Sequence, residues 1–160
     1  IEPSGDSGTT LTAVVISEVG WRRSSVTDVI HIGDSRCYRI SQGGGVADLL
    51  TSDHSVTGSM VRAGYIETHH IPETAGSNTL TMHIGDEGGS VAEVQSITTG
   101  SSSFLLCCDG VWDPLHVKEG FWLPPQSSGG QDMVDKLVQE ALERGSTDNC
   151  SALLVEPVGK

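Results

Sequence analysis

The chain has 160 residues, of which 21 are Asp or Glu and nine are Lys or Arg, so its formal net charge is −12. A chain of this length can bury roughly 68–70% of its unfolded surface, and we expect one domain over residues 1–160. The acidic balance argues against nucleic acid as a partner, because such binding depends on clustered bases. It suits cations or basic peptide segments, or else it serves solubility alone.

No apolar stretch approaches the ~18–20 residues of a membrane span, so we expect no membrane contact from this chain. The four cysteines, Cys37, Cys107, Cys108 and Cys150, form no CxxC pair and have no spacing with His of the kind that zinc sites use. Each lies in an apolar, strand-like segment, which favours buried reduced thiols over disulfides. This usage predicts a reducing, cytoplasmic location.

The first third of the chain is predicted to form strands. Residues 10–19, rich in Thr, Val and Ile, predict one strand, and residues 25–32 predict a second that pairs with it as a hairpin. After a polar corner at 33–36, residues 37–40 and 46–50 predict two more strands. We expect these four strands to form an antiparallel meander.

Strands and helices mix in the rest of the chain. Ser55 is expected to cap a short helix that ends at Gly64, and residues 67–77 read as an irregular surface loop. Apolar runs at 91–97, 104–108 and 151–155 predict further strands.

The clearest helix follows the turn-like segment 127–130. Met133, Leu137, Ala141 and Leu142 recur at helical spacing, and Gly145 supplies the stop. Helices laid on antiparallel sheet predict an α+β layered fold.

Two acidic residues are expected at the ends of buried strands. Asp109 follows the apolar run 104–108 and precedes a glycine, and Asp148 comes shortly before the predicted strand 151–155. Carboxylates held rigidly at strand ends are ligands that Mg²⁺ and Mn²⁺ prefer, and a following glycine lets backbone and solvent come close. Each acid could also be an ordinary turn residue that accepts backbone hydrogen bonds.

Several segments resemble, in order along the chain, the motifs of the metal-dependent (PPM, type 2C-like) Ser/Thr protein phosphatases. GTT at 8–10 is similar to the family's Ser-Gly-x-Thr segment, and HIGDSRCY at 31–38 resembles NVGDSRAY. LTSDHS at 50–55, with GYI at 64–66, resembles LTxDHS and GxI, and NTLTMHIG at 78–85 resembles NxLTRALG. LLCCDGVWD at 105–113 resembles LLLCSDGLWD, and GSTDNCSALLV at 145–155 resembles GSxDNITVIVV.

This resemblance implies a layered αββα sandwich of two antiparallel sheets flanked by helices, with the family's N-terminal strands and first helix absent, so that the chain is a partial catalytic domain. It implies hydrolysis of phosphoserine or phosphothreonine in phosphorylated proteins by a metal-activated water, with two Mn²⁺ or Mg²⁺ ions as cofactors and a third at an additional site. Asp109 and Asp148 match ligands of the paired ions, while Asp34 and Asp113 match the additional site.

The resemblance also places a flap near the catalytic cleft at residues 67–77, which include Glu67, His69 and His70. A plain solvent loop is the alternative. For Asp34 the alternative is an ion pair or turn bond with the Arg36 region, and Arg36 is expected to brace the corner rather than bind substrate. His54, His69, His70 and His83 have no partner at diagnostic spacing, and we interpret them as structural or solvent-facing.

The departures from the family pattern leave a second function open. The family's opening metal-binding Asp-Gly and phosphate-gripping Arg have no counterpart in residues 1–7, and Met82 replaces the arginine of LTRALG. The alternative to an enzyme is therefore a non-catalytic, phosphatase-like module that binds a partner. The presence of both Asp109 and Asp148 favours the enzyme, because a scaffold without chemistry has no physical need for two strand-end carboxylates.

Overall fold

The structure is a computed structural model that describes residues 7–19, 24–41, 47–67, 79–86, 88–117, 120–124 and 130–157. Its elements in chain order are β1 (Leu11–Val19), β2 (Ser24–Ile32), β3 (Arg36–Ile40), β4 (Ala47–Leu49), α1 (Val56–Arg62), β5 (Glu93–Thr98), β6 (Ser103–Cys107), α2 (Asp109–Leu115), β7 (His116–Val117), β8 (Gly120–Phe121), α3 (Gly130–Glu143) and β9 (Ala152–Val155).

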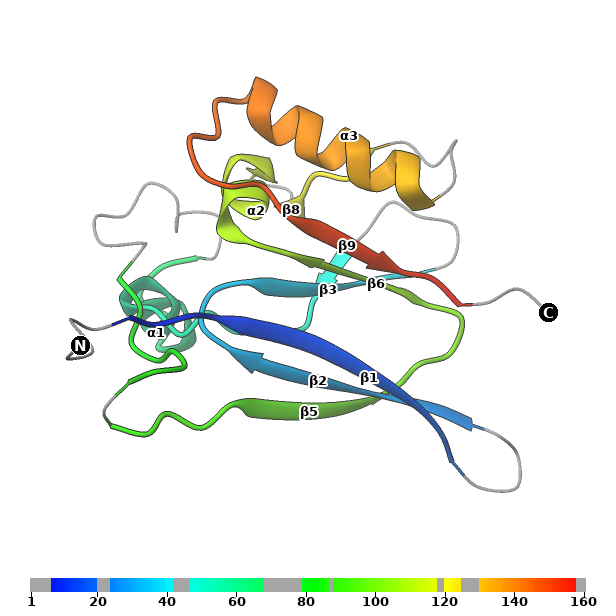
Figure 1. Ribbon diagram of the computed structural model, residues 1–160, viewed down its shortest axis with the longest axis horizontal. Coiled ribbons are helices and arrows are strands. Elements are labelled where there is room, and N and C mark those ends of the chain that lie inside the picture. Colours follow the sequence, from blue (N-terminus) through cyan, green and yellow to red (C-terminus); the bar gives the residue numbers. More distant parts are fainter. Residues whose placement is uncertain are drawn as a thin grey trace, which may run out of the picture.

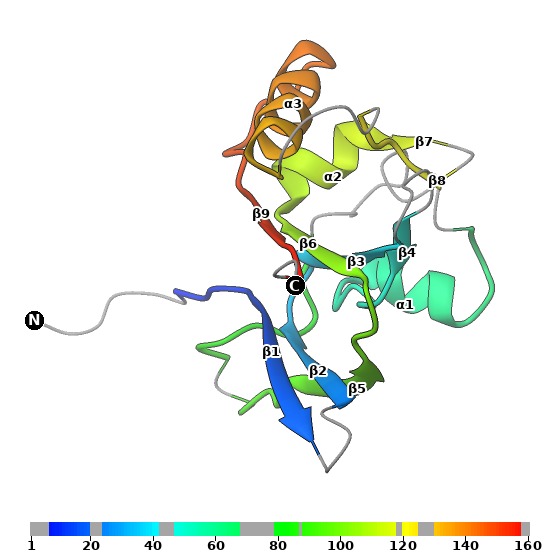
Figure 2. The same cartoon turned by 90° about the vertical axis from the view of Figure 1, so that its right-hand side faces the viewer.

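Two antiparallel sheets are stacked, with helices α2 and α3 on one side of the stack (Figures 1 and 2). One sheet has the order β1-β2-β5 and the other the order β4-β3-β6-β9, while β7 and β8 form a small separate hairpin. Helices α2 and α3 cover the face of the second sheet that points away from the first. This arrangement is the layered α+β fold that the sequence predicts, with stacked antiparallel sheets and helices.

Strands β3 and β6 are buried on both faces, because each lies between the other sheet and the helices. Cys37 and Leu106 point into the core between the sheets, whereas Tyr38 and Leu105 point toward α2 and α3. Burial on both faces requires apolar side chains at successive positions, which explains why residues 104–107 read as a continuous apolar run.

The predicted four-strand meander is wrong. The hairpin β1-β2 forms, with Leu11 opposite Ile32, but β2 pairs next with β5 rather than with β3. The chain leaves the first sheet at Gly33, whose φ is 109° and whose missing Cβ leaves room for the side chain of Thr10. This corner carries β3 into the second sheet, where it pairs with β4 and β6.

Both predicted helices form, and both have the predicted ends. Ser55 caps α1 by accepting a hydrogen bond from the Gly58 amide at 3.0 Å. Helix α3 ends at Glu143, two residues before Gly145, whose φ is 92°, and the Ser146 amide donates back to the Ala141 carbonyl at 3.0 Å. This is the glycine C-cap expected for that position. None of the helices that the structure describes is long and apolar enough to cross a bilayer.

Candidate metal centre

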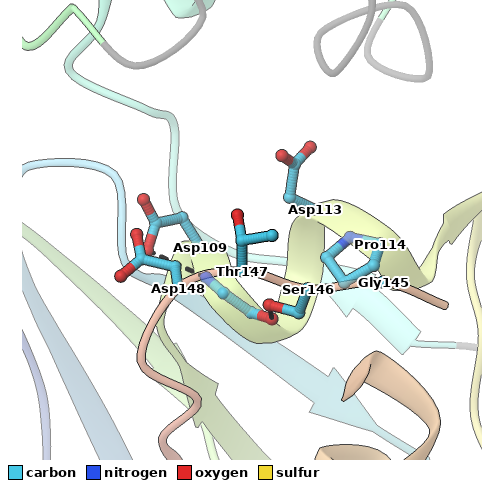
Figure 3. Close-up of a pocket in the computed structure, with 8 residues that line it drawn as sticks. Asp109, Asp113, Pro114, Gly145, Ser146, Thr147 and Asp148 are labelled. Atoms are coloured by element: carbon cyan, nitrogen blue, oxygen red, sulfur yellow. Dashed lines mark hydrogen bonds between the residues drawn. The ribbon is translucent and has the colours of Figure 1, made fainter. Parts of the chain in front are cut away.

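The two predicted strand-end carboxylates lie at the same end of two neighbouring strands in the second sheet. Strands β6 and β9 are antiparallel neighbours with Cys107 opposite Ala152, so the end of β6 lies beside the start of β9. Asp109 begins α2 directly after β6, and Asp148 lies in the loop before β9. Both line a pocket of about 260 Å³, which is shown in Figure 3. The structure therefore brings the two acids together.

Gly110 allows the two acidic segments to approach each other. A Cβ at this position would lie 2.5 Å from the Asn149 carbonyl oxygen and 3.3 Å from Cβ of Asp148. No side chain fits at the first of these distances, so only glycine permits the observed packing. The glycine after Asp109 thus has the role that the sequence predicted, namely to let backbone come close.

Each carboxylate is held by one oxygen. Asp109 Oδ1 accepts a hydrogen bond from the Gly110 amide at 2.9 Å, and Asp148 Oδ1 accepts one from the Asn149 amide at 2.7 Å. The second oxygen of each acid has no hydrogen-bond partner among the residues that the structure describes. The predicted turn bonds are therefore present, but they leave two carboxylate oxygens available to a ligand in the pocket.

Asp113 adds a third acid to the pocket. It lies one helical turn after Asp109 on α2, and its Oδ1 atom is buried without a hydrogen-bond partner in the described part of the chain. Burial raises the pKa of Asp113, nearby Arg36 partly opposes this, and the negative charge of Asp109 raises it further. A buried carboxylate oxygen without a donor is energetically costly unless a proton or a cation satisfies it.

Asp34 lies near the same acids, from the corner between β2 and β3. It is 9% exposed, and burial together with the charges of Asp109 and Asp53 raises its pKa to about 6. Its backbone carbonyl accepts a hydrogen bond from Nε1 of Trp112 at 2.9 Å. The ion pair that the structure shows for Arg36 is with Asp53, although the charge of Arg36 partly opposes the rise in the pKa of Asp34.

Arg36 braces the corner, as the sequence predicted. It is fully buried, and its Nε and Nη2 atoms donate to both carboxylate oxygens of Asp53 at 2.9 and 2.8 Å. Its guanidinium carbon lies 3.4 Å from the centroid of the Trp112 ring. Arg36 therefore joins the loop before α1 to helix α2, and none of these contacts leaves it free for a substrate.

Of the predicted flap residues and the histidine of the LTSDHS motif, the structure describes only some. Glu67 is exposed at the end of a described segment, while His69 and His70 lie outside the described residues. His54 is fully buried, accepts a hydrogen bond from the Gly33 amide at 3.1 Å and lies 3.2 Å from Glu93. His54 is therefore part of the packing between segments.

Sequence reasoning missed three parts of the site. Helix α2 was not predicted, because it is only seven residues long and contains Pro114. The pocket residues Ser146 and Thr147 are ordinary turn residues in sequence, and Asp53 is buried by a partner 17 positions away. The motif LTSDHS, which contains Asp53, was the one signal that could have marked this acid as more than a loop residue.

The donor set suits a hard divalent cation, although it does not enclose one. Three carboxylates line the pocket, and Asp109 raises the pKa of both Asp113 and the nearby Asp34, so these acids gain from positive charge. In the described ranges, no group of three or more His, Cys, Asp or Glu side chains is spaced to hold a metal ion. The described residues thus fit as part of a cation-binding surface made of oxygen donors.

No protein-family model matches the chain. A curated relative, the serine/threonine phosphatase Stp of Listeria innocua, is 28% identical over 152 residues, which are 93% of this chain and 56% of that protein. The chain thus spans about half the length of the curated relatives that it matches, or less.

Solved structures share the fold. The PPM Ser-Thr phosphatase MsPP from Mycobacterium smegmatis, solved in complex with cacodylate, is 31% identical and superposes with a TM-score of 0.78 over 97% of this chain and 65% of that one. The catalytic domain of the phosphatase PstP, solved with two manganese ions, is 25% identical with a TM-score of 0.71, over 97% of this chain and 61% of that one. The chain is therefore a relative of the PPM, type 2C-like Ser/Thr protein phosphatases and has their fold over the part that it spans.

Proposed function

We propose that this chain carries part of the active centre of a metal-dependent phosphatase that hydrolyses phosphoserine or phosphothreonine in protein substrates. The observation that carries the proposal is the meeting of Asp109 and Asp148 at one sheet edge, in the pocket that Asp113 also lines. Relatives named as Ser/Thr phosphatases support it.

The residues in and around the pocket would have different roles. Asp109 and Asp148 would hold the paired Mn²⁺ or Mg²⁺ ions through the carboxylate oxygens that accept no backbone hydrogen bond, and Asp34 and Asp113 would hold an additional ion. Bound divalent cations would supply positive charge against phosphate oxygens and would lower the pKa of water. Gly110 keeps the two acidic segments in contact, and the buried Arg36 holds α2 against the corner that carries Asp34.

The charge of the chain bears on its substrates, and its free cysteines bear on the cellular compartment. The acidic pocket and the net charge of −12 suit phosphorylated segments flanked by basic residues, and they disfavour nucleic acid. All four cysteines are free, with Cys37 and Cys107 buried. Free cysteines support a reducing, cytoplasmic location.

The test is hydrolysis of a phosphothreonine peptide with and without Mn²⁺, by the chain and by its Asp109→Asn and Asp148→Asn variants. Even groups that only support a metal ligand change affinity or activity by about 10–100-fold, so loss of a ligand should lower turnover by at least about 100-fold. The matched control is Asp135→Asn, because Asp135 lies on α3 outside the pocket, accepts a hydrogen bond only from Gln131 among the described residues, and should leave turnover unchanged.

Because the chain spans part of its relatives, the same assay is run on a longer version of the protein that covers their full length. Turnover only in the longer version, lost on Asp109→Asn, would show that the centre needs residues outside 1–160. No turnover in either version and no binding of Mn²⁺ would contradict the proposal and favour the non-catalytic binding module.

A further inference from the structure

Two thiols flank the carboxylates of the candidate centre and have no part in the function proposed above. Cys108 directly precedes Asp109, and Cys150 follows Asp148 by two residues. Both are partly buried, and both pack against the core between the second sheet and α2 and α3. They therefore lie at the junction of the two acidic segments.

Each thiol bonds to the segment that carries the other acid. Cys108 Sγ donates to the carbonyl of Asn149, the residue after Asp148, at 3.0 Å, and it accepts from the Ser151 amide at 3.2 Å. Cys150 Sγ donates to the carbonyl of Gly110, the residue after Asp109, at 3.2 Å. The backbone next to each carboxylate is thus tied across the gap by a thiol from the opposite side.

These positions are departures from the motifs that the chain otherwise resembles. The pattern LLLCSDGLWD has serine where this chain has Cys108, and GSxDNITVIVV has isoleucine where it has Cys150. The two departures contact each other's segments, although 41 residues separate the pair Cys108 and Asn149. Cys37 and Cys107 differ from this pair, because both are core residues. Burial raises the pKa of both thiols, to about 12 for Cys37.

We infer that Cys108 and Cys150 are positioning residues for the carboxylate pair. Asp109 and Asp148 repel each other when no cation is bound, and the two S–H···O bonds together with the close contact at Gly110 oppose their separation. A pair held together in advance loses less free energy on binding a cation. This inference rests on the proposed function for its consequence, but not for its geometry.

The test compares the chain with the Cys108→Ala/Cys150→Ala and Cys108→Ser/Cys150→Ser double variants by two measurements. Titration with Mn²⁺ alone, followed by electron paramagnetic resonance, should show affinity weaker by about five- to tenfold in the alanine pair, since the three weak hydrogen bonds of the two thiols are lost. The serine pair keeps hydroxyl donors and should stay within about twofold. In the cation-free protein, the Ser151 amide should exchange with solvent about tenfold faster in the alanine pair.

The matched control is Cys37→Ala, which removes a fully buried thiol that does not line the pocket. It should lower the free energy of unfolding without changing Mn²⁺ affinity, and an equal loss of affinity in this variant would overturn the inference. If the alanine pair does not fold, Cys150→Ala alone leaves both bonds of Cys108 and should show an intermediate effect.

Unchanged Mn²⁺ affinity and unchanged Ser151 exchange in the alanine variants would also overturn the inference. If the wild-type chain binds no Mn²⁺, the proposed function fails for this chain, and the exchange measurement alone decides whether the thiols tie the two segments together.

Discussion

Arg36 is a buried charge whose partners make its burial tolerable. It is fully buried, whereas Asp53, which it holds through two hydrogen bonds, is 4% exposed, and Nη1 of Arg36 also lies 3.3 Å from the Tyr38 hydroxyl. The stacked Trp112 ring covers the planar face of the guanidinium. This geometry depends on the fork of arginine, which lysine lacks.

We expect Arg36→Lys to destabilise the fold by at least about 2 kcal/mol, because breaking a buried pair leaves a charge without compensation. The control is Arg39→Lys, since the Arg39–Asp48 pair is 37% and 46% exposed at its two side chains. An exposed pair of this kind should change stability by no more than about 0.5 kcal/mol. Urea unfolding measures both, and equal losses would contradict the role assigned to Arg36.

His31 links stability to pH. It is 2% exposed, its Nδ1 lies 3.0 Å from the Thr12 hydroxyl, and its Nε2 lies 3.2 Å from the Ser52 carbonyl. Burial lowers its pKa from 6.5, and the charge of neighbouring His54 lowers it further. Below about pH 6.5 the unfolded chain therefore takes up a proton at this residue that the folded chain resists.

The free energy of unfolding should consequently fall as the pH decreases from about 7 to about 5, by the contribution of His31. In His31→Asn, which installs the residue of the family pattern NVGDSRAY, this part of the decrease should disappear. Thermal unfolding of both proteins across this range measures the difference. Curves of equal slope would show that His31 does not contribute to the acid sensitivity.

The start of α2 and the loop before β9 depend on each other. Gly110 sits where a side chain would meet the Asn149 carbonyl, and Ser146 Oγ donates to the Gly110 carbonyl at 2.7 Å. Helix α2 has no side-chain cap at Cys108 and is short, so packing rather than intrinsic propensity holds it.

We expect Gly110→Ala to destabilise the fold by about 1–3 kcal/mol and to weaken Mn²⁺ binding, because the added methyl group pushes the two acidic segments apart. Gly88→Ala is the control, since its nearest atom would be the end of the exposed Asp86 side chain at 3.3 Å. Chemical unfolding and Mn²⁺ titration measure the two effects. Similar stability and affinity in both variants would contradict this account of the junction.

Both sheets end in strands without a further partner in the described structure. Strand β1 is an edge of the first sheet and β9 an edge of the second. Leu11 on β1 is 43% exposed and Leu153 on β9 is 58% exposed, and both line a groove of about 350 Å³. Unpaired edges with exposed apolar side chains favour association.

We therefore expect the 160-residue chain to associate as its concentration rises, through these edges. Leu11→Lys and Leu153→Lys should each reduce association, while Leu142→Lys should not, because Leu142 is 54% exposed on α3 and does not line this groove. Sedimentation velocity over a concentration series measures the mass. A wild-type protein that stays a monodisperse monomer at all concentrations would contradict this prediction.

Much of this architecture was predictable because it follows from short-range pattern. The Thr, Val and Ile content of β1, the alternation in β2, the helical spacing of Leu137 and Ala141 and the capping by Ser55 and Gly145 each depend on residues within a few positions of one another. The same holds for Asp109 and Asp148, because an acid beside an apolar run can be placed at a strand end without knowledge of the fold.

Long-range contacts account for what the pattern did not predict. The pairing of β2 with β5 rather than β3, the Arg36–Asp53 pair and the position of Asp34 near Asp109 join residues that are distant along the chain. Local spacing does not determine which strands become neighbours in a sheet, because any apolar strand can form hydrogen bonds with another. The acidic residues of the candidate centre could thus be identified from the sequence alone. The tertiary structure brought them together, because β6 pairs with β9 and α2 packs against the corner at Gly33.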